Sequence, residues 1–536
     1  MTVVGEQTGA SAAGPAWRRT YHTVLSGLRR RRWLTSLAPW LLIATVAAAA
    51  WLARAIGITR NYDVFIDELT YTRIADNLAT GHGLVLYGGP FDLHPPAGFA
   101  LYALVIKVLA LHGGLANILF ALRPFVALLG SITCALACCL VSGIAGWRAG
   151  AVVAVVAALD PFEIYFDSRV MLEAPGQLAA VLAILLLATS LRSRSERWSW
   201  ALVVLSGIAA GIAICTKEDF GLVLALTLVF SLATAWVTER RKAAVALTVM
   251  CGCYILSESL VIASTGFQTW WNQNADGLRR LIGSEQISGF NSSTVHVSLV
   301  SRAAANATHF GITYLILGSG ALAGVLQVVA VIRRRTEWLK SAQAADRGRI
   351  LVALWAVAAA VYLCYATLFG TLEEQIYYMW YMPSLCTLTL LAWPSISRLT
   401  AHWRKIAIAV LAAIVLADSA VWVAVYQRPD DEYRQLLAWA PRHLPAGSTV
   451  AVTEYTAQFL LRRVILGKWA TIPSLIEHHV DYVLLSTTLV RQGYGIGRPK
   501  FERYLQIHAT VVFRATGASE GELIMYDVRA ITGARI

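Results

Sequence analysis

Long apolar runs recur along almost the whole chain, and they constrain its fold more than any other feature. A helix that spans a membrane needs about 17–25 mostly apolar residues. Only 14% of the residues are charged, against about 25% in ordinary soluble domains. We therefore predict a polytopic α-helical membrane protein. The apolar runs are residues 35–56, 118–142, 148–164, 173–191, 198–216, 219–237, 244–265, 308–332, 350–370, 377–396 and 404–427.

A twelfth run, 96–112, is ambiguous, and the charges of the loops decide its interpretation. Lys and Arg gather in cytoplasmic loops, so the arginine-rich segments 28–33 and 192–197 should lie on the same side. The chain must then cross an even number of times between them, and the other four runs satisfy this. Residues 96–112 begin with a proline and carry Lys107, which suits an interfacial or re-entrant helix. We predict about 11 transmembrane helices, with the N-terminus inside and the C-terminus outside.

Polar composition marks the regions outside the membrane. We expect a cytoplasmic tail at 1–34, a transmembrane domain at 35–427 whose first outer loop is 57–117, and a C-terminal extracytoplasmic α/β domain at 428–536. In that domain four segments read as strands: "STVAVTEY", "DYVLLST", "ATVVFRAT" and "GELIMYDV". The formal charge is +13, and we attribute it to Lys and Arg in loops that orient the protein in the membrane, not to nucleic-acid binding. The eight cysteines lie in apolar runs and read as buried side chains, not as disulfides or zinc ligands.

Ionisable residues gather on the predicted outer side, at the ends of separate spans. An unpaired charge at membrane depth costs several kcal/mol, so such residues suggest function. The alternative is that acids and bases only pair with each other, and we favour pairing or solvation for Glu163, Asp219 and Glu373. We favour function for Asp67, Arg169, Glu173 and Lys217.

These residue types indicate one kind of chemistry. A lysine and an arginine can hold a phosphate, one as a point charge and the other as a fork. A carboxylate can remove a proton from a hydroxyl. Together they suit attack of a hydroxyl on a sugar carbon, with a lipid phosphate as the leaving group. A soluble nucleotide-sugar donor would be on the wrong side of the membrane.

Four motifs in order resemble the GT-C membrane glycosyltransferases, in the clan of protein O-mannosyltransferases and lipid A aminoarabinose transferases. The first is an Asp-Glu pair followed by a tyrosine and a short helix. The next is a "HPP" motif, followed by an Arg with an acid a few residues later, and then a "TK" after a later span. The matching segments are "DELTYTRIADNLATGHG" (67–83), "DLHPPAGF" (92–99), "SRVMLEAP" (168–175) and "CTKED" (215–219).

The resemblance implies an inverting transfer of a hexosyl or pentosyl group from a polyprenyl-phosphate sugar to an acceptor outside the cytoplasmic (plasma) membrane. It implies that Asp67 is the general base and that Lys217 and Arg169 contact the donor phosphate. Glu173 would organise the catalytic site. Further substrate-binding residues would come from the first two motifs and from the late tyrosines. They are Tyr71, Asp92, His94, Tyr377 and Tyr378.

Several alternatives stay open at this point. Glu68 is interpreted as a catalytic partner of Asp67, a metal ligand, a hydrogen-bond orienter or a solvated neighbour, and one of the two acids could only cap the following helix. A divalent ion held by Asp67, Glu68 and Asp92 is conceivable, although no cofactor is established. Thr70 stands where aminoarabinose transferases tend to have arginine, which argues against that sugar.

The acceptor is not specified: it could be a protein, a lipid or a glycan. Membrane lipid is the remaining expected partner, and nucleic acid is not one. The alternative function is a multi-span transporter or flippase for a lipid-linked or small polar substrate. Charges at span ends on one side, without an inverted repeat, argue against it.

Overall fold

The computed structural model describes residues 40–285, 298–426, 429–492, 496–519 and 521–533. The predicted tail at 1–34 lies outside these residues. Contacts divide the chain into two units, Met1–Thr45 and Val46–Ile536. In the smaller unit, the described residues are the start of the helix Trp40–Ala55. Apart from the start of this helix, all elements and contacts described below belong to the larger unit.

In the described residues each predicted apolar run overlaps a helix, except that the run 148–164 covers two helices separated by a bend. Among the described residues, seven helices are long and apolar enough to cross a membrane, or eight if the bent pair α5 (Trp147–Leu159) and α6 (Pro161–Asp167) is one span. Helix α9 (Glu218–Thr234), which has 17 residues, and α15 (Glu374–Arg398) are not among the seven. A polytopic helical membrane protein is therefore confirmed, while the count of 11 stays a prediction. The helices are Trp40–Ala55, α4 (Leu115–Ala145), α5 (Trp147–Leu159), α6 (Pro161–Asp167), α7 (Glu173–Ser190), α8 (Glu196–Thr216), α9 (Glu218–Thr234), α10 (Arg240–Thr265), α12 (Leu299–Arg333), α14 (Ala344–Leu368), α15 (Glu374–Arg398) and α16 (Ala401–Tyr426).

Short elements occupy the predicted first outer loop. They are α2 (Ile66–Ala79), the paired strands β1 (Val85–Leu86) and β2 (Gly89–Pro90), and α3 (Ala97–Val108). Helix α3 has 12 residues and so rises about 18 Å, while a bilayer core is about 30 Å thick. It packs against α2. The length of α3 agrees with the prediction that 96–112 does not cross.

A 65° bend separates α5 from α6. Pro161 at the start of α6 has no N–H to continue the preceding helix, and the residue before a proline avoids helical geometry. Asp160 is extended there, and its side chain accepts from Phe162 N and Glu163 N. Thr313 of α12 donates to the other oxygen of Asp160 at 2.9 Å. The bend directs the chain into the segment that carries Arg169.

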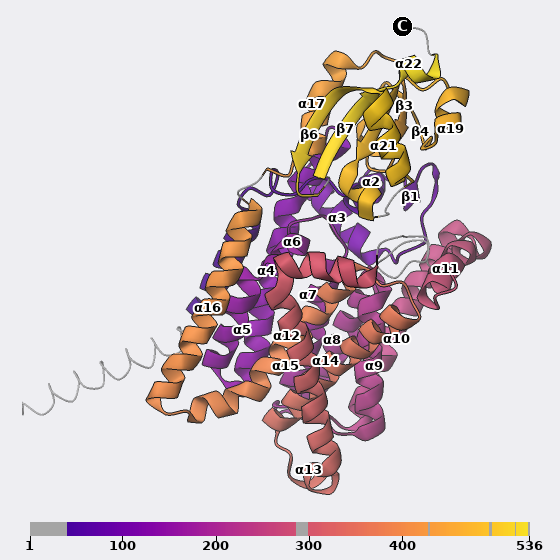
Figure 1. The fold of residues 1–536 in the computed structure, drawn as a ribbon. Coiled ribbons are helices and arrows are strands. Elements are labelled where there is room, and N and C mark those ends of the chain that lie inside the picture. The colour runs from indigo at the N-terminus through magenta and orange to yellow at the C-terminus, as the bar shows by residue number, and fades with distance from the viewer. Residues whose placement is uncertain (1–39, 286–297, 427–428, 493–495, 520, 534–536) are drawn as a thin grey trace, which may run out of the picture. The chain divides into compact units, whose positions relative to one another are not determined.

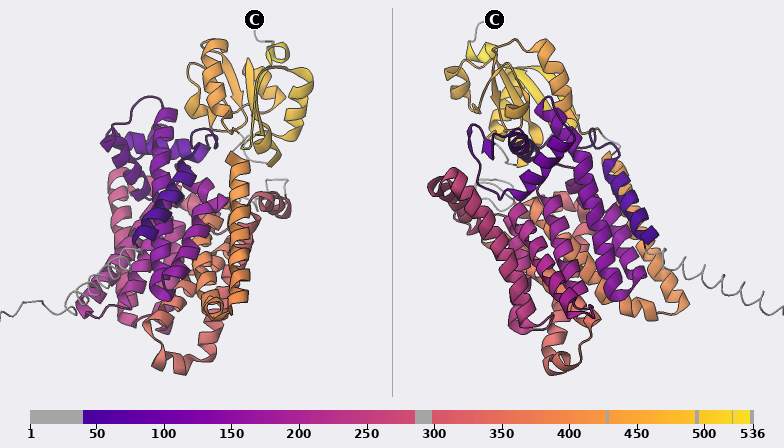
Figure 2. Two further views of the ribbon diagram at one scale, coloured as in Figure 1. Left: turned by 90° about the vertical axis from the view of Figure 1, so that its left-hand side faces the viewer. Right: turned by 180° about the vertical axis from the view of Figure 1, so that it is seen from behind.

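One residue joins the long helices α8 and α9. Lys217 is extended, with φ −157° and ψ 126°, and it ends one helix and begins the next. Two acids follow in the first turn of α9, where the positive end of the helix dipole favours them. Lys217 therefore has little conformational freedom at the junction of the two helices. The long helices lie side by side in Figure 1 and in both views of Figure 2.

A mixed five-stranded sheet forms the C-terminal region, in the order β4-β3-β5-β7-β6. Strand β3 pairs in parallel with β4 and β5, while β7 pairs antiparallel with β5 and β6. All four predicted strands are present, and β4 is an additional one. The strands are β3 (Thr449–Val452), β4 (Ile465–Gly467), β5 (Tyr482–Ser486), β6 (Thr510–Gly517) and β7 (Gly521–Asp527).

The two faces of the sheet pack into different clusters because side chains alternate along a strand. Val450 and Met525 share one cluster with Leu69 of α2 and Phe99 of α3. Ala451 and Ile524 face the other way, into a cluster with helices of the C-terminal region. The helices outside the bundle are α11 (Phe267–Leu281), α13 (Arg335–Ser341), α17 (Glu432–His443), α18 (Ala457–Leu460), α19 (Ile472–Glu477), α20 (Thr487–Gln492), α21 (Pro499–His508) and α22 (Arg529–Thr532). One face of the sheet therefore belongs to the same apolar cluster as the short outer-loop helices, and a boundary at 428 stays a prediction.

Candidate functional site

Asp67 lies in the first turn of α2, at the positive end of that helix, where a carboxylate is favoured. The side chain is half-buried. Its Oδ2 accepts a hydrogen bond from Gln375 Nε2 at 3.3 Å. Gln375 stands near the start of α15, so two helix starts that are 308 residues apart meet at this carboxylate.

Lys217 connects this pair to Glu173. Its ammonium donates to Gln375 Oε1 at 2.6 Å and to Glu173 Oε1. Glu173 begins α7 and is buried, while Lys217 is 7% exposed. The structure therefore brings together three predicted residues from three places in the sequence. We call the connected set Glu173, Lys217, Gln375 and Asp67 the polar chain.

The pKa of Asp67 is raised to about 6. Burial is the main cause, and the carboxylates of Glu373 and Glu173 add to it. Lys217 and His94 act in the opposite direction. A base with a pKa just below the working pH is both ionised and more basic than an ordinary aspartate. Asp67 therefore has the protonation behaviour that proton removal from a hydroxyl requires.

Glu68, which we expected to act beside Asp67, is fully buried in an ion pair with Arg123 of α4. Arg123 donates from Nε to Oε1 at 3.0 Å and from Nη2 to Oε2 at 2.7 Å. The same carboxylate accepts from Val170 N at 2.8 Å and from Phe65 N at 3.3 Å. Both oxygens are thus occupied by the protein, and the predicted catalytic or metal-binding role of Glu68 finds no support in this geometry.

Arg169, predicted to contact the donor phosphate, is 4% exposed and is packed among aromatic rings. Its guanidinium lies 4.1 Å from the ring centre of Tyr165, and Nη2 donates to Ser519 Oγ at 3.2 Å. The Ser519 hydroxyl donates to Asp430 Oδ2 at 2.6 Å. Arg169 therefore connects the segment before α7 to the β6–β7 turn, and no hydrogen bond described for it joins it to the polar chain.

A second pair of carboxylates lies beside this connection. Asp63 accepts from Tyr433 N at 3.0 Å, and its own N–H donates to Asp430 Oδ2 at 3.2 Å. Burial and the neighbouring Asp430 raise the pKa of Asp63 to about 8. The contact between the start of α2 and the C-terminal region therefore depends on a carboxyl group that titrates near neutral pH.

The loop with Asp92 and His94 is held from one side by α11. Gln273 accepts from Asp92 N at 2.8 Å and donates to Pro90 O at 2.9 Å, and Asn274 donates to Asp92 O at 3.0 Å. His94 Nδ1 lies 3.6 Å from Glu218 Oε2, one residue after Lys217. His94 thus stands near the polar chain, whereas Asp92 is anchored mainly through its backbone.

The three predicted tyrosines have different surroundings. Tyr71 is buried, with its ring 5.6 Å from that of Phe99. Tyr377 is half-buried, with its ring 5.4 Å from that of Tyr314.

The third tyrosine, Tyr378, is fully buried and donates to Asp167 Oδ1 at 2.6 Å. Asp167 also pairs with Arg54 at 2.7 Å. Tyr378 belongs to this buried network inside the helix bundle, and no hydrogen bond described for it joins it to the polar chain; its place on a donor path stays a prediction.

The alternative of a divalent metal ion can be compared with the geometry of the acids. In the described ranges, no group of three or more His, Cys, Asp or Glu side chains could hold a metal ion. Glu68 faces Arg123, and Asp67 faces Gln375. The alternative of a divalent ion between Asp67, Glu68 and Asp92 is therefore unsupported by the geometry.

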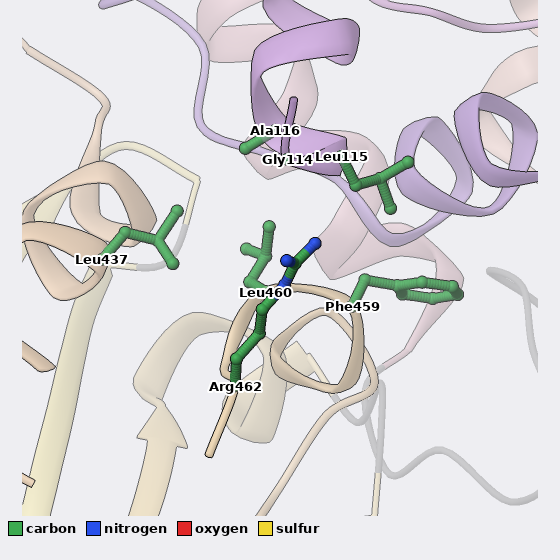
Figure 3. A pocket seen from close by; sticks show the side chains of 7 residues that line it. All are labelled: Gly114, Leu115, Ala116, Leu437, Phe459, Leu460 and Arg462. Atoms are coloured by element: carbon green, nitrogen blue, oxygen red, sulfur yellow. The ribbon is translucent and has the colours of Figure 1, made fainter. Parts of the chain in front are cut away.

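A small pocket of about 190 Å³ lies elsewhere, between the start of α4 and residues of α17 and α18. Figure 3 shows the side chain of Arg462 reaching toward the start of α4. No member of the polar chain lines this pocket. Its walls are Gly114, Leu115, Ala116, Leu437, Phe459, Leu460 and Arg462.

Two residues of this region were missed by the sequence analysis. Gln375 carries no charge and belongs to none of the four motifs. Arg123 lies inside an apolar run, and that position is a signal that could have found it, because a buried arginine needs a partner. Its partner Glu68 is 55 residues away in the sequence, so the pairing of these two residues could not be predicted from the sequence.

Comparison with known proteins rests on structure alone. No protein-family model and no curated protein matches the sequence. Among solved structures, the oligosaccharyltransferase AglB from Archaeoglobus fulgidus, in complex with an inhibitory peptide and a dolichol-phosphate, superposes with a TM-score of 0.57. The identity is 12%, and the match covers 85% of this chain and 70% of that one.

A second match is ArnT from Cupriavidus metallidurans bound to undecaprenyl phosphate. Its TM-score is 0.54 and its identity 15%, and the match covers 93% of this chain and 100% of that one. Both are GT-C membrane glycosyltransferases. The present chain has the GT-C fold, as the four motifs led us to expect.

Proposed function

We propose that this protein transfers a sugar from a polyprenyl-phosphate-linked donor to an acceptor hydroxyl, with inversion at the sugar carbon. The observation that carries the proposal is the polar chain. It places a lysine ammonium and a half-buried aspartate on two different elements, joined through a single amide side chain. The two functional groups that the reaction requires, a phosphate-binding cation and a base, are thus neighbours.

Asp67 is the base in this proposal. The acceptor oxygen attacks the anomeric carbon, and its proton passes to the Asp67 carboxylate. The bond between the sugar carbon and the phosphate oxygen breaks, and polyprenyl phosphate leaves with the electron pair. A pKa near 6 leaves Asp67 ionised at neutral pH before the attack.

Lys217 is the phosphate-binding residue. An ammonium has three N–H donors, and Glu173 and Gln375 engage two of them. Asp219 Oδ2 lies 4.0 Å away, beyond hydrogen-bond distance, so one donor can reach a phosphate oxygen. When no sugar-phosphate substrate is bound, the carboxylate of Glu173 neutralises Lys217. This pairing lowers the free-energy cost of keeping the ammonium buried.

The remaining predicted residues receive supporting roles. Glu68 and Arg169 position the segments around α2 and α7, and His94 adds positive potential near Asp67 when it is protonated. The proposed donor class is supported by the two structural neighbours, whose structures contain dolichol-phosphate and undecaprenyl phosphate. We propose a location in the cytoplasmic membrane with the polar chain on the outer side; the sugar and the acceptor are not assigned.

We do not propose a transporter as a second function. Buried charges inside the helix bundle could mark a pathway, but Arg54 and Asp167 there are paired with each other. Arg54 binds Asp167 and three backbone carbonyls, and Tyr378 completes the network.

Sugar transfer in proteoliposomes tests the proposal, with a panel of polyprenyl-phosphate sugars and acceptors. We expect transfer by the wild type and a loss of at least a hundredfold in Asp67→Asn, with donor binding retained. Asp76→Asn on the same helix is the matched control and should keep activity. No transfer by folded wild type with any donor, together with solute flux, would favour a transporter.

A further inference from the structure

Gln375 occupies a position that neither the motifs nor the proposed roles explain. It is half-buried at the start of α15 and contacts both functional members of the polar chain. Its side chain can only be oriented one way. An ammonium has donors and no acceptor, so the amide oxygen must face Lys217. The amide nitrogen then faces Asp67, which must accept.

This orientation has a consequence for the state of Asp67. A donor aimed at Oδ2 stabilises the ionised carboxylate, because a protonated carboxyl offers a weaker acceptor. The other groups around Asp67 have mixed effects. Glu173 of α7 and Glu373 at the start of α15 oppose its charge, while Lys217 and His94 favour it. Tyr71 on α2 also lies within electrostatic range.

We infer that Gln375 is a positioning residue that orients Asp67 and keeps it ionised, using Lys217 to fix the direction of its own amide. This inference rests on the proposed function, in which Asp67 is the base and Lys217 binds phosphate. Because Lys217 contacts Gln375, a phosphate that draws Lys217 also acts on the amide beside the base. Binding of the sugar donor at Lys217 is thereby connected, through the neutral side chain of Gln375, to the orientation and ionisation of Asp67.

Two substitutions separate the two contacts of Gln375. Gln375→Glu has the same shape and can still accept from Lys217, but it cannot donate to Asp67 and adds a third nearby acid. Gln375→Met has a similar length and removes both contacts. Gln268→Glu, exposed on α11, is the matched control for the added charge. Thermal unfolding of each purified variant checks that it is folded.

The first measurement does not depend on transfer activity. Carbodiimide reacts with protonated carboxyl groups, so labelling of Asp67 followed by mass spectrometry reports its titration. We expect the labelling midpoint to lie near pH 6 in the wild type and in Gln268→Glu. It should rise by about one pH unit or more in Gln375→Glu, because a donor is replaced by an acid. Gln375→Met should shift it upward by less.

The second measurement is the pH profile of transfer. We expect the acidic limb to move with the labelling midpoint, so that kcat in Gln375→Glu falls about tenfold at pH 5 but only about twofold at pH 7, and recovers at higher pH. The donor KM should change less than about threefold. An unchanged midpoint with normal transfer, or a loss confined to KM, would overturn the inference while leaving the proposed function intact. A shifted midpoint with no transfer by the wild type would instead support the position of Gln375 and refute the proposed function.

Discussion

Arg123 of α4 holds Glu68 of α2 with two parallel hydrogen bonds, 3.0 Å and 2.7 Å long, while both side chains are fully buried. Arg123 also donates to three backbone carbonyls just before α2, those of Ile58, Tyr62 and Asp63. The pair therefore fixes where α2 begins. Asp67 owes its position to the neighbouring acid, which we had expected to share its chemistry.

Removing one member of this pair should destabilise the protein. Glu68→Gln leaves Arg123 buried without a carboxylate, and such a loss costs about 3–5 kcal/mol. Denaturant unfolding in detergent measures it. Glu522→Gln, which disturbs an exposed pair with Arg514 at 3.6 Å, should cost less than about 1 kcal/mol. Normal stability with abolished transfer would assign Glu68 a catalytic role instead.

Transfer should depend on pH through Asp67. The carboxylate is the active form, so the rate should fall tenfold per pH unit below about pH 6. Initial rates between pH 4.5 and 8 measure the limb, with Asp76→Asn as the control. A rate that stays constant down to pH 4.5 would exclude Asp67 as the base.

Asp67 should also lower the stability of the folded state at neutral pH. Its pKa is higher in the folded protein than the ordinary value of 3.8, so folding is opposed once the carboxyl ionises. The penalty is absent below pH 3.8 and complete above about pH 6. Asp67→Asn should therefore melt at a higher temperature than the wild type at pH 7.5 and at nearly the same temperature at pH 4. Equal melting temperatures at both values would contradict this.

Donor affinity should depend on Lys217. A hydrogen bond from a charged group contributes about 1.5–3 kcal/mol, which corresponds to about 10–100-fold in affinity. Lys217→Met combined with Glu173→Gln avoids leaving a buried acid unpaired. Binding of undecaprenyl phosphate to the purified protein measures the loss. Lys242→Met, which disturbs a pair with Glu196 at 3.2 Å, is the control and should bind normally.

The contact around Asp63 should weaken as pH rises. The pKa of Asp63 is raised from 3.8 to about 8, so its ionisation opposes folding, and stability should fall as pH rises from about 4 to 8 and level off above 8. Hydrogen exchange at Tyr433 N, which donates to Asp63, should become faster between pH 5 and 8 after correction for the intrinsic rate, and should level off above pH 8. Asp63→Asn keeps an acceptor and should remove this pH dependence. An unchanged dependence in that variant would refute the assignment.

The helices and strands were largely predictable from the sequence because each depends on local periodicity. The four strand segments are short apolar runs rich in β-branched and aromatic residues, and β3, β5 and β7 lie within them, while β6 extends one residue beyond its segment. Strand β4 was missed because three residues carry too little pattern. The two helices of the bent pair were read as one run because both are apolar, although the Asp160-Pro161 step was visible.

The polar chain was predictable only in part. Charge at span ends pointed to Asp67, Glu173 and Lys217, and packing brought them together. Arg169 was expected beside Lys217 because both are cations, but aromatic rings and Ser519 hold it elsewhere. A neutral side chain such as Gln375 gives no signal, since its importance comes from a contact across 308 residues.

The one-residue junction at Lys217 limits how this chain can change in length. Each added residue turns the following helix by about 100° and advances it by about 1.5 Å. An insertion in a flexible loop is absorbed by the loop, but here it would rotate all of α9 against its neighbours α10 and α14. Insertions and deletions should therefore be tolerated in the α12–α14 connection far better than between Thr216 and Glu218, so that this lysine keeps a fixed register with both helices.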